Sequence, residues 1–398
     1  MNHYTEWVEK NFDVIVIGLG AMGSAAAYKL AKRGQRVLGI DQFDPPHTLG
    51  SSHGESRIIR QAIGEGKEYV PLVLRAYELF REIERDTGTS LLVETGGLII
   101  ADPSDDSGQH GVQGFLQATV ATAEEYNIPH TVLDNAQLKK RFPQFSTGSN
   151  EMGYYEPGAG FLRPERCIES QLQLAEKYGA TLHRNERVLS FAVGAGNDRV
   201  TVTTDKGKYE AGKLALCAGP WIGQLLKQDA ALLKIFRQVL FWFEVQDSIE
   251  PYLPGNFPIF IWTAGKDIDL LYGFPALEGS AGGVKVATEQ YETTVDSPEQ
   301  TKRDVSLEEI VQMQRHVVEF LPALSGKCIK AESCLYTVTP DSRFIIDAHP
   351  AHPNVIVASP CSGHGFKHSA AIGEVIAQLV TEGKSAFDIR GFGFDRFK

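Results

Sequence analysis

The stretch FDVIVIGLGAMGSAAAYKLAKRGQRVLGID, residues 12–41, decides the fold of this chain. An apolar run, 14–17, precedes three glycines at G-x-G-x-x-G spacing, and an alanine-rich segment and a second apolar run follow. The glycines are Gly18, Gly20 and Gly23, and the second run ends at Asp41. Strand, glycine turn, helix, strand and acid in this order predict a βαβ unit that binds a dinucleotide.

Each part of this unit has a physical reason. The glycines permit a tight turn and let the backbone approach a pyrophosphate. The N-terminus of the helix offers free N–H groups and a partial positive charge to the phosphates. Asp41 ends the second strand, where a carboxylate can accept hydrogen bonds from both ribose hydroxyls. We therefore predict that the three glycines and Asp41 bind the cofactor.

The bulk properties are those of an ordinary globular chain. Its 398 residues exceed what one small core needs, so two domains are expected. A hydrophobic content of 42% and a charged content of 22% fit this class. The net charge of −11 and the lack of a Lys/Arg block argue against binding to nucleic acid. An anionic substrate would therefore need a local cluster of cations.

Neither membrane insertion nor a disulfide framework is expected. No apolar run approaches the ~20 residues of a membrane span, and the start, MNHYTEWVEKNFD, lacks the features of a secretory signal. The five cysteines are scattered and form no C-x-x-C pair, so we expect neither disulfides nor a metal site. The cytoplasm fits these features best.

The remaining pattern predicts an interleaved α/β (α+β) fold. Helices are expected over 67–87, 112–126, 136–142, 164–179, 305–321 and 370–382, a strand pair over 91–101, and separate strands over 208–211 and 213–217. Two aromatic and β-branched stretches, 235–247 and 257–275, are typical of antiparallel strands. We predict a discontinuous Rossmann-like nucleotide-binding domain over 1–92, 153–225 and 325–398, and an antiparallel-sheet substrate domain over 93–152 and 226–324.

Three distant stretches could carry chemistry. The first, 51–65, includes Arg57 and Arg60 three residues apart, which suits a substrate carboxylate or a flavin phosphate, although the pattern by itself is more typical of a solvated basic turn. The second contains Cys334, although a lone cysteine is more often a small buried side chain. The third, SGHGFK at 362–367, predicts a phosphate- or carbonyl-binding turn or a plain helix cap.

The chain resembles the family of monomeric sarcosine oxidase and N-methyltryptophan oxidase, flavoenzymes with the fold of D-amino-acid oxidase. The resemblance extends from Asp13 to Phe394 and rests on long motifs. These are DPPHTLGSSHGESRIIRQAIGEGKEYVPL (44–72), EPGAGFLRPE (156–165), LCAGPW (216–221), YGFP (272–275), CLYT (334–337), FIID (344–347) and SGHGFK (362–367).

The resemblance implies a role for each matched residue. Cys334 matches a cysteine that bonds through sulfur to the 8α-methyl of FAD, and Arg60 with Lys367 matches the pair that grips the substrate carboxylate. Lys285 matches a lysine that activates dioxygen. The expected catalytic residues are Lys285, Arg60, Lys367, His53, Tyr272 and His364. The expected cofactor-binding residues are Gly18, Gly20, Gly23, Asp41, Ser51, Arg57, Cys334, Tyr336, Gly363, Gly365 and Lys367.

One position departs from the family pattern. The family often carries a histidine four residues after the oxygen-activating lysine, and this chain has Glu289 there. A carboxylate in place of an imidazole changes the charge of the pocket and bears on which amine fits.

The resemblance implies a monomeric FAD-dependent oxidase of a secondary amino acid such as sarcosine or N-methyltryptophan, with dioxygen as acceptor. Its products would be hydrogen peroxide and an imine that hydrolyses to formaldehyde and an amino acid. A cyclic or other amino acid, such as L-proline, L-pipecolate or glycine, is an alternative substrate. An NAD-dependent dehydrogenase and a non-catalytic flavin-binding protein are alternative classes. The SGHGFK turn and Cys334 argue against the dehydrogenase, which needs neither, and a non-catalytic protein would have no use for Lys285 together with Arg60 and Lys367.

Overall fold

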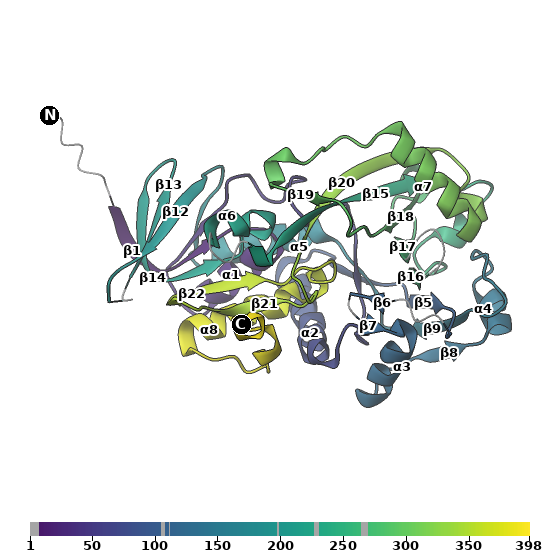
Figure 1. The fold of residues 1–398 in the computed structure, drawn as a ribbon, viewed down its shortest axis with the longest axis horizontal. Coiled ribbons are helices and arrows are strands. Elements are labelled where there is room, and N and C mark those ends of the chain that lie inside the picture. The colour runs from purple at the N-terminus through teal and green to yellow at the C-terminus, as the bar shows by residue number, and fades with distance from the viewer. Residues whose placement is uncertain (1–7, 105–107, 111, 197–198, 227–230, 264–269) are drawn as a thin grey trace.

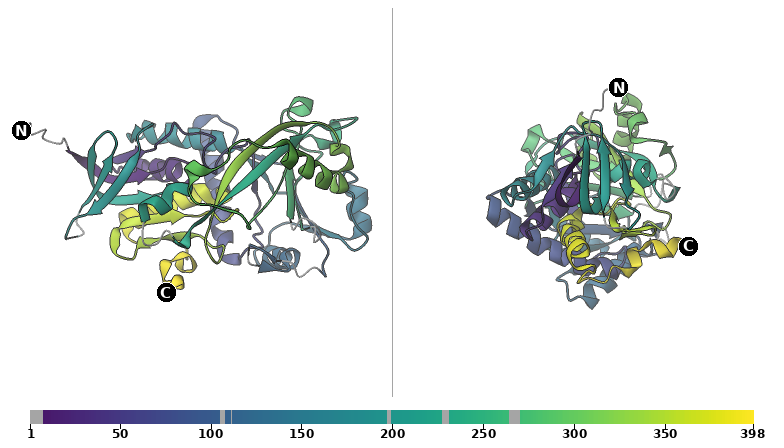
Figure 2. Two further views of the ribbon diagram at one scale, coloured as in Figure 1. Left: turned by 45° about the horizontal axis from the view of Figure 1, so that its top comes forward. Right: turned by 90° about the vertical axis from the view of Figure 1, so that its left-hand side faces the viewer.

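The structure is a computed structural model that describes residues 8–104, 108–110, 112–196, 199–226, 231–263 and 270–398. Two large sheets lie next to each other along the long axis of the molecule (Figure 1). The N-terminal and C-terminal segments, purple and yellow in Figures 1 and 2, lie together at one end. Segments from both ends of the chain therefore build the same half.

The first sheet has eight strands and contains the predicted βαβ unit, which is confirmed. Strand β1 (Val8–Ile17) lies between β2 (Val37–Ile40) and β14 (Lys208–Leu216), and both pairings are parallel. Helix α1 (Ala21–Lys32) connects β1 to β2. The other strands are β11 (Thr181–His183), β12 (Val188–Val193), β13 (Val200–Thr204), β21 (Ile345–His349) and β22 (His352–Ser359).

Helices cover this sheet closely. Helix α1 packs against α5 (Pro164–Lys177) and α8 (Ser369–Glu382). A Cβ atom at Gly373 of α8 would lie 2.5 Å from the backbone of Ala25, so the glycine is what lets the two helices approach. Helix α2 (Val70–Thr87) packs on α8, and the short α6 (Ile222–Leu226) follows β14.

The second sheet has nine strands and is the predicted antiparallel-rich region. Along its path, the strands are β19 (Thr294–Val295), β15 (Lys234–Phe243), β18 (Val284–Thr288), β17 (Leu270–Phe274), β16 (Ile259–Thr263), β5 (Gly97–Ala101), β9 (Met152–Glu156) and β8 (Thr131–Leu133), with β20 (Cys328–Val338) paired to β15. Strands β9 and β20 lie within the ranges predicted for the FAD-binding domain, and the domain boundaries stay a prediction.

The period of two along the strands gives this sheet two buried faces. On β17, Tyr272 and Phe274 belong to the core shared with α1, whereas Leu271 packs in a second core with Val317. Val317 lies on α7 (Leu307–Phe320), which covers the outer face. Side chains on the inner face therefore point toward the nucleotide-binding half.

Smaller elements complete the fold. A three-stranded sheet joins β3 (Arg57–Ile59), β10 (Gly160–Leu162) and β4 (Leu92–Glu94), and it brings Arg57 between the two large sheets. The others are β6 (Gly108–Gln109), β7 (Val112–Gln113), α3 (Phe115–Glu125) and α4 (Asn135–Arg141). Among the described residues, no helix combines the length and apolar character that a membrane crossing needs.

Three local predictions were wrong. The expected helix over 112–126 begins only at 115, because Gly114 takes a left-handed conformation (φ 59°) after β7. The strands within 91–101 form but do not pair with each other, since the chain turns at Gly96 (φ 76°) and β4 and β5 enter different sheets. The two strands expected at 208–211 and 213–217 are one strand, β14, because β1 pairs with it along its whole length.

Candidate active site

The turn between β1 and α1 forms one wall of a cavity, the first of two described below. At Gly18 (φ 85°) a Cβ atom would lie 2.5 Å from the carbonyl oxygen of Cys217, and at Gly23 it would lie 1.6 Å from that of Gly18. An added Cβ at Gly20 meets nothing within 4 Å. Two of the glycines therefore allow close backbone packing, and the third leaves open space in front of the turn.

Asp41 lies in the wall of the same cavity at the end of β2. Its Oδ2 accepts a hydrogen bond from Leu19 N (2.7 Å) and its Oδ1 accepts one from Phe43 N (2.9 Å). Burial raises the pKa of this carboxyl group, while the two backbone N–H groups act to lower it. Asp41 thus also fixes the glycine turn through Leu19, a role that its spacing alone did not reveal.

A second cavity adjoins the first. Three short segments contribute neighbouring residues to both, which shows that the cavities lie next to each other. Ser52, Thr337 and Cys361 line the first cavity, and Arg57, Tyr336 and Gly363 of the same three segments line the second. A dinucleotide fits this arrangement, with its phosphates at the glycine turn, its ribose at Asp41 and its ring system toward the second cavity. Ser51, predicted to bind the cofactor, also lines the first cavity.

The second cavity brings together the predicted cations. Arg57, Arg60 and Lys367 all line it, although Arg60 and Lys367 are far apart in sequence. Lys367 Nζ donates to His364 O (2.6 Å), and burial lowers the pKa of this lysine to about 8, with Glu65 acting in the opposite direction. Arg57 donates to Ser51 O (2.7 Å) and Ser56 O (2.8 Å).

Two residues that sequence reasoning missed also lie in this cavity. Glu65 Oε2 is 2.5 Å from Arg60 Nη2, and both side chains are almost fully buried. His110 lies with Nδ1 3.6 Å from Glu65 and Nε2 2.9 Å from Glu289. Burial raises the pKa of Glu65, but Arg60 and His110 outweigh it, so the pKa is well below its usual value. Arg60 therefore has a carboxylate partner, which the predicted clamp did not include.

Lys285 lies on β18 and is buried between the two halves. Its Nζ donates to Gly54 O (2.7 Å), Ser56 O (2.9 Å) and Ser56 Oγ (3.1 Å), and it lies 4.4 Å from the ring centre of Phe274. Burial lowers the pKa of this lysine, and Arg57 lowers it further. Three acceptor oxygens match the three N–H groups of an ammonium and oppose that effect.

Cys334 and the two predicted tyrosines lie nearby on β20 and β17. Tyr272 and Tyr336 have their hydroxyl oxygens 3.3 Å apart, and burial raises the pKa of both phenols. Cys334 is fully buried, which raises the pKa of its thiol, while the charges of Arg57 and Lys285 act to lower it. Burial outweighs the two cations, so the pKa of the Cys334 thiol lies above its usual value.

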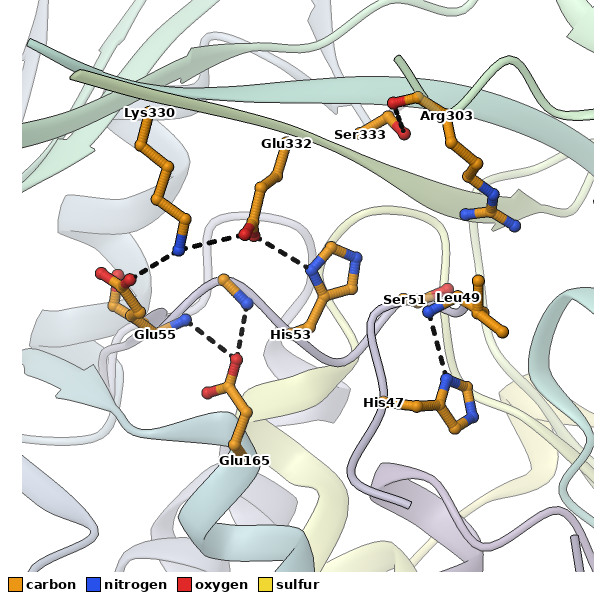
Figure 3. A network of polar contacts seen from close by, with 12 residues as sticks. His47, Leu49, Ser51, His53, Glu55, Glu165, Arg303, Lys330, Glu332 and Ser333 are labelled. Atoms are coloured by element: carbon orange, nitrogen blue, oxygen red, sulfur yellow. Dashed lines mark hydrogen bonds and ion pairs between the residues drawn. The ribbon is translucent and has the colours of Figure 1, made fainter. Parts of the chain in front are cut away.

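His53 belongs to a network that ties the loop 51–56 to β20 (Figure 3). Its Nδ1 lies 3.5 Å from Glu332, which is also 3.0 Å from Lys330 Nζ, and these partners lower the pKa of Glu332 to about 2. Lys330 also contacts Glu55 at 2.7 Å. From α5, Glu165 accepts from the backbone N–H groups of residues 54 and 55. The network holds the loop that carries His53 and precedes Arg57.

The SGHGFK turn is a tightly packed connection. Gly363 has φ 82°, and a Cβ there would come within 2.9 Å of His110 Nε2. At Gly365 a Cβ would lie 1.6 Å from Pro360 O. His364 Nε2 donates to Ser342 O (3.1 Å), and burial holds its pKa well below its usual value. His364 is thus a neutral residue of the cavity wall.

Comparisons with known proteins agree on one family. A family model described as FAD dependent oxidoreductase matches residues 13–379. The chain is 41% identical to a monomeric sarcosine oxidase of Streptomyces avermitilis, over 95% of this chain and 96% of that one. It is 34% identical to an N-methyl-L-tryptophan oxidase of Yersinia pestis, over 98% and 100%. The open form of NikD, an unusual amino acid oxidase essential for nikkomycin biosynthesis, has a similar fold (TM-score 0.82, 23% identity, 97% and 98% coverage).

Proposed function

Because the chain belongs to the family of FAD-dependent oxidoreductases that includes monomeric sarcosine oxidase and N-methyl-L-tryptophan oxidase, we propose that it oxidises a secondary, N-methyl α-amino acid. It is an FAD-dependent amine oxidase. The matching family is described as FAD dependent, so the cofactor is FAD and the NAD-dependent alternative is excluded. Sarcosine and N-methyltryptophan are the proposed substrates, with dioxygen as the electron acceptor.

The second cavity is the observation that carries the proposal. Its cations suit a carboxylate, and its apolar and aromatic wall suits the carbon skeleton of an amino acid. When bound, FAD takes a hydride equivalent from the carbon next to nitrogen and passes the electrons to dioxygen, which yields hydrogen peroxide. The glycine turn, Asp41 and Ser51 hold the cofactor in the first cavity.

The substrate carboxylate binds to Lys367 and Arg60. Lys367 has no carboxylate within ion-pair distance in the part of the chain that the structure describes, whereas Arg60 is shared with Glu65. A charge-assisted hydrogen bond in such a buried site contributes on the order of 1.5–3 kcal/mol. The aromatic side chains Tyr272, Phe274 and Tyr336 exclude water around the reacting carbon.

The ammonium form of Lys285 would supply a positive charge where dioxygen takes up electrons, and its three acceptor oxygens favour that form against burial. Its position is fixed by three oxygens of the loop 54–56 and by two aromatic rings, those of Phe274 and Trp242. A charge that is already in place needs no rearrangement when negative charge develops nearby. His364 lines the second cavity, and the buried His53 contacts Glu332 of β20.

Cys334 is the residue proposed to hold FAD covalently, through its sulfur at the 8α-methyl group. Support comes from its burial and from the charges of Arg57 and Lys285 near the thiol. Acid-precipitated protein should keep its yellow colour, and Cys334→Ser should release it. Colour in the supernatant of the unmutated protein would show that the attachment is not covalent.

Location and assembly belong to the same proposal. None of the five cysteines forms a disulfide, which fits a reducing compartment such as the cytoplasm. The relatives named monomeric sarcosine oxidase support a monomer.

A substrate panel tests the proposed function. Purified protein is mixed in air with sarcosine, N-methyltryptophan, glycine, L-proline and L-pipecolate, and hydrogen peroxide and formaldehyde are measured. We expect both products from the N-methyl amino acids and little peroxide from methylated amines without a carboxylate. Peroxide from the cyclic amino acids alone, without formaldehyde, would assign the enzyme to the alternative substrates.

A further inference from the structure

Glu289 is a carboxylate in the wall of the second cavity that the proposed function does not use. It directly follows β18 and lies four residues after Lys285, so the two-residue period of a strand puts both side chains on the inner face. The rise of a strand separates them by roughly 13 Å along the wall. Glu289 lines the cavity together with Lys367, and its side chain is only 8% exposed.

One oxygen of this carboxylate is held firmly. Glu289 Oε2 accepts from His110 Nε2 at 2.9 Å and from the hydroxyl group of Tyr291 at 2.8 Å. Among the described residues, both hydrogen bonds to the Glu289 carboxylate end at Oε2, and none ends at Oε1. A carboxylate has about four acceptor positions, so Oε1 retains acceptor capacity toward the cavity.

His110 fixes the charge state of this wall. Burial acts to lower its pKa, but Glu289 and Glu65 together raise it to about 9. The ring is therefore an imidazolium at neutral pH, and its two nitrogens face the two carboxylates. Glu65 also pairs with Arg60. His110 therefore connects this ion pair to Glu289 and holds one oxygen of the Glu289 carboxylate in place.

The charges of the cavity thus match an amino-acid zwitterion. Cationic groups, Lys367 and Arg60, offer donors to the carboxylate of such a ligand. Glu289 offers an acceptor to its ammonium group. Two opposite contacts orient a small ligand along one axis, which a single carboxylate clamp cannot do.

Resting on the proposed function, we propose that Glu289 is a specificity-determining residue that accepts a hydrogen bond from the substrate amine through Oε1. His110 and Tyr291 are positioning residues that hold Glu289 in place. The substrate class is then an α-amino acid with at least one N–H on its protonated amine. The affinity for ligands that keep the carboxylate but lack the amine does not depend on Glu289.

Two ligands with the same carboxylate separate the amine contact from the rest of the site. One is sarcosine. The other is (methylthio)acetate, an isostere of sarcosine in which an uncharged thioether sulfur replaces the amine. Binding of (methylthio)acetate to the flavin-loaded protein is followed by the change in the visible flavin spectrum. The Kd of sarcosine is obtained by rapid anaerobic mixing, from the dependence of the rate of flavin bleaching on sarcosine concentration. For Glu289→Gln we expect the Kd of sarcosine to rise about 10–100-fold, the scale of one charge-assisted hydrogen bond. The Kd of the isostere should stay within about twofold.

Further variants serve as controls for this experiment. Glu292→Gln changes an exposed carboxylate three residues away and should alter neither Kd. His110→Asn and Tyr291→Phe should raise the Kd of sarcosine less than Glu289→Gln does, again without affecting the isostere. Glu289→Asp keeps the charge but shortens its reach, so its effect should be intermediate. Flavin content and thermal midpoint show whether each variant is folded.

The outcomes are distinct. Equal weakening of both ligands in Glu289→Gln, or no weakening of either, overturns the proposal and leaves Glu289 as part of the wall. If sarcosine shifts the flavin spectrum of the unmutated protein without bleaching it, the proposed function fails. In that case the ratio of the two Kd values still decides whether Glu289 contacts the amine.

Discussion

The two cavities of this molecule are built in opposite ways. The first has a backbone wall at the glycine turn, next to Asp41, and residues from segments such as 42–52, 217–225 and 358–361 complete it. The second carries charged side chains from four separate segments. Arg60 pairs with Glu65, His110 lies between Glu65 and Glu289, and Lys367 lines the same cavity. The backbone site is therefore sensitive to added volume, whereas the side-chain site is sensitive to charge.

The largest expected effect of added volume is at Gly23. In Gly23→Ala, the new Cβ would collide with the carbonyl oxygen of Gly18, which as backbone cannot swing away. We expect a loss of unfolding free energy of at least about 1–3 kcal/mol and a purified protein with little flavin. Flavin content and the thermal midpoint measure both effects.

Gly20→Ala is the matched control, because its Cβ meets no protein atom within 4 Å and its φ is −69°. We expect this variant to keep its thermal midpoint and to lose only part of its flavin. If the two variants behave alike, close backbone packing is not what the glycines supply.

The largest expected effect of charge is at Lys285. Lys285→Met should slow the reaction of the substrate-reduced enzyme with dioxygen by roughly 10²–10³-fold, the scale for losing one preorganised electrostatic group. Anaerobic reduction by substrate should be affected much less. Rapid mixing separates the two half-reactions, and an equal loss in both would point to a structural role.

Lys367 tests the carboxylate clamp through pH. Its pKa is about 8, so it is charged below that pH and becomes neutral above it. Binding of (methylthio)acetate, which has no amine to titrate, should therefore weaken as the pH rises through 8. His110, with a pKa of about 9, is the other cation that titrates in the cavity.

Lys367→Met should raise the Kd of this ligand about 10–100-fold at neutral pH and remove the pH dependence near 8. Arg60→Met should have the smaller effect on binding, because Glu65 already balances Arg60. A Kd that does not change with pH in the unmutated protein would argue against Lys367 as the main partner of the carboxylate.

The smallest expected effect is at Lys330, on the outer side of the same region. Its ammonium contacts Glu55 and Glu332 and lies 4.5 Å from the ring centre of Trp242, but its side chain is 37% exposed. Lys330→Met should change the unfolding free energy by less than about 1 kcal/mol, as for other solvated ion pairs. Chemical denaturation measures this change, and normal reactivity with dioxygen makes the variant the control for Lys285→Met.

The sequence predicted the fold and the first cavity well, because strand, glycines, helix and Asp41 are local in the chain. Resemblance to a family supplied Arg60, Lys367, Lys285 and Cys334, whose roles stay proposals. Neither route found Glu65 or His110. His110 directly follows β6, in a segment that contains no family motif, and only tertiary packing brings it to Glu289. Single ionisable residues in loops carry no spacing signal that reveals such a partner.

The anaerobic reaction with sarcosine tests the central claim most directly. The purified protein is mixed with sarcosine without dioxygen, the flavin absorption is followed, and formaldehyde is measured. The account predicts that the flavin bleaches, that formaldehyde appears in proportion to the flavin, and that admitting air restores the colour with release of peroxide. A flavin that stays oxidised with sarcosine and with N-methyltryptophan, or that bleaches equally with methylamines lacking a carboxylate, would contradict it.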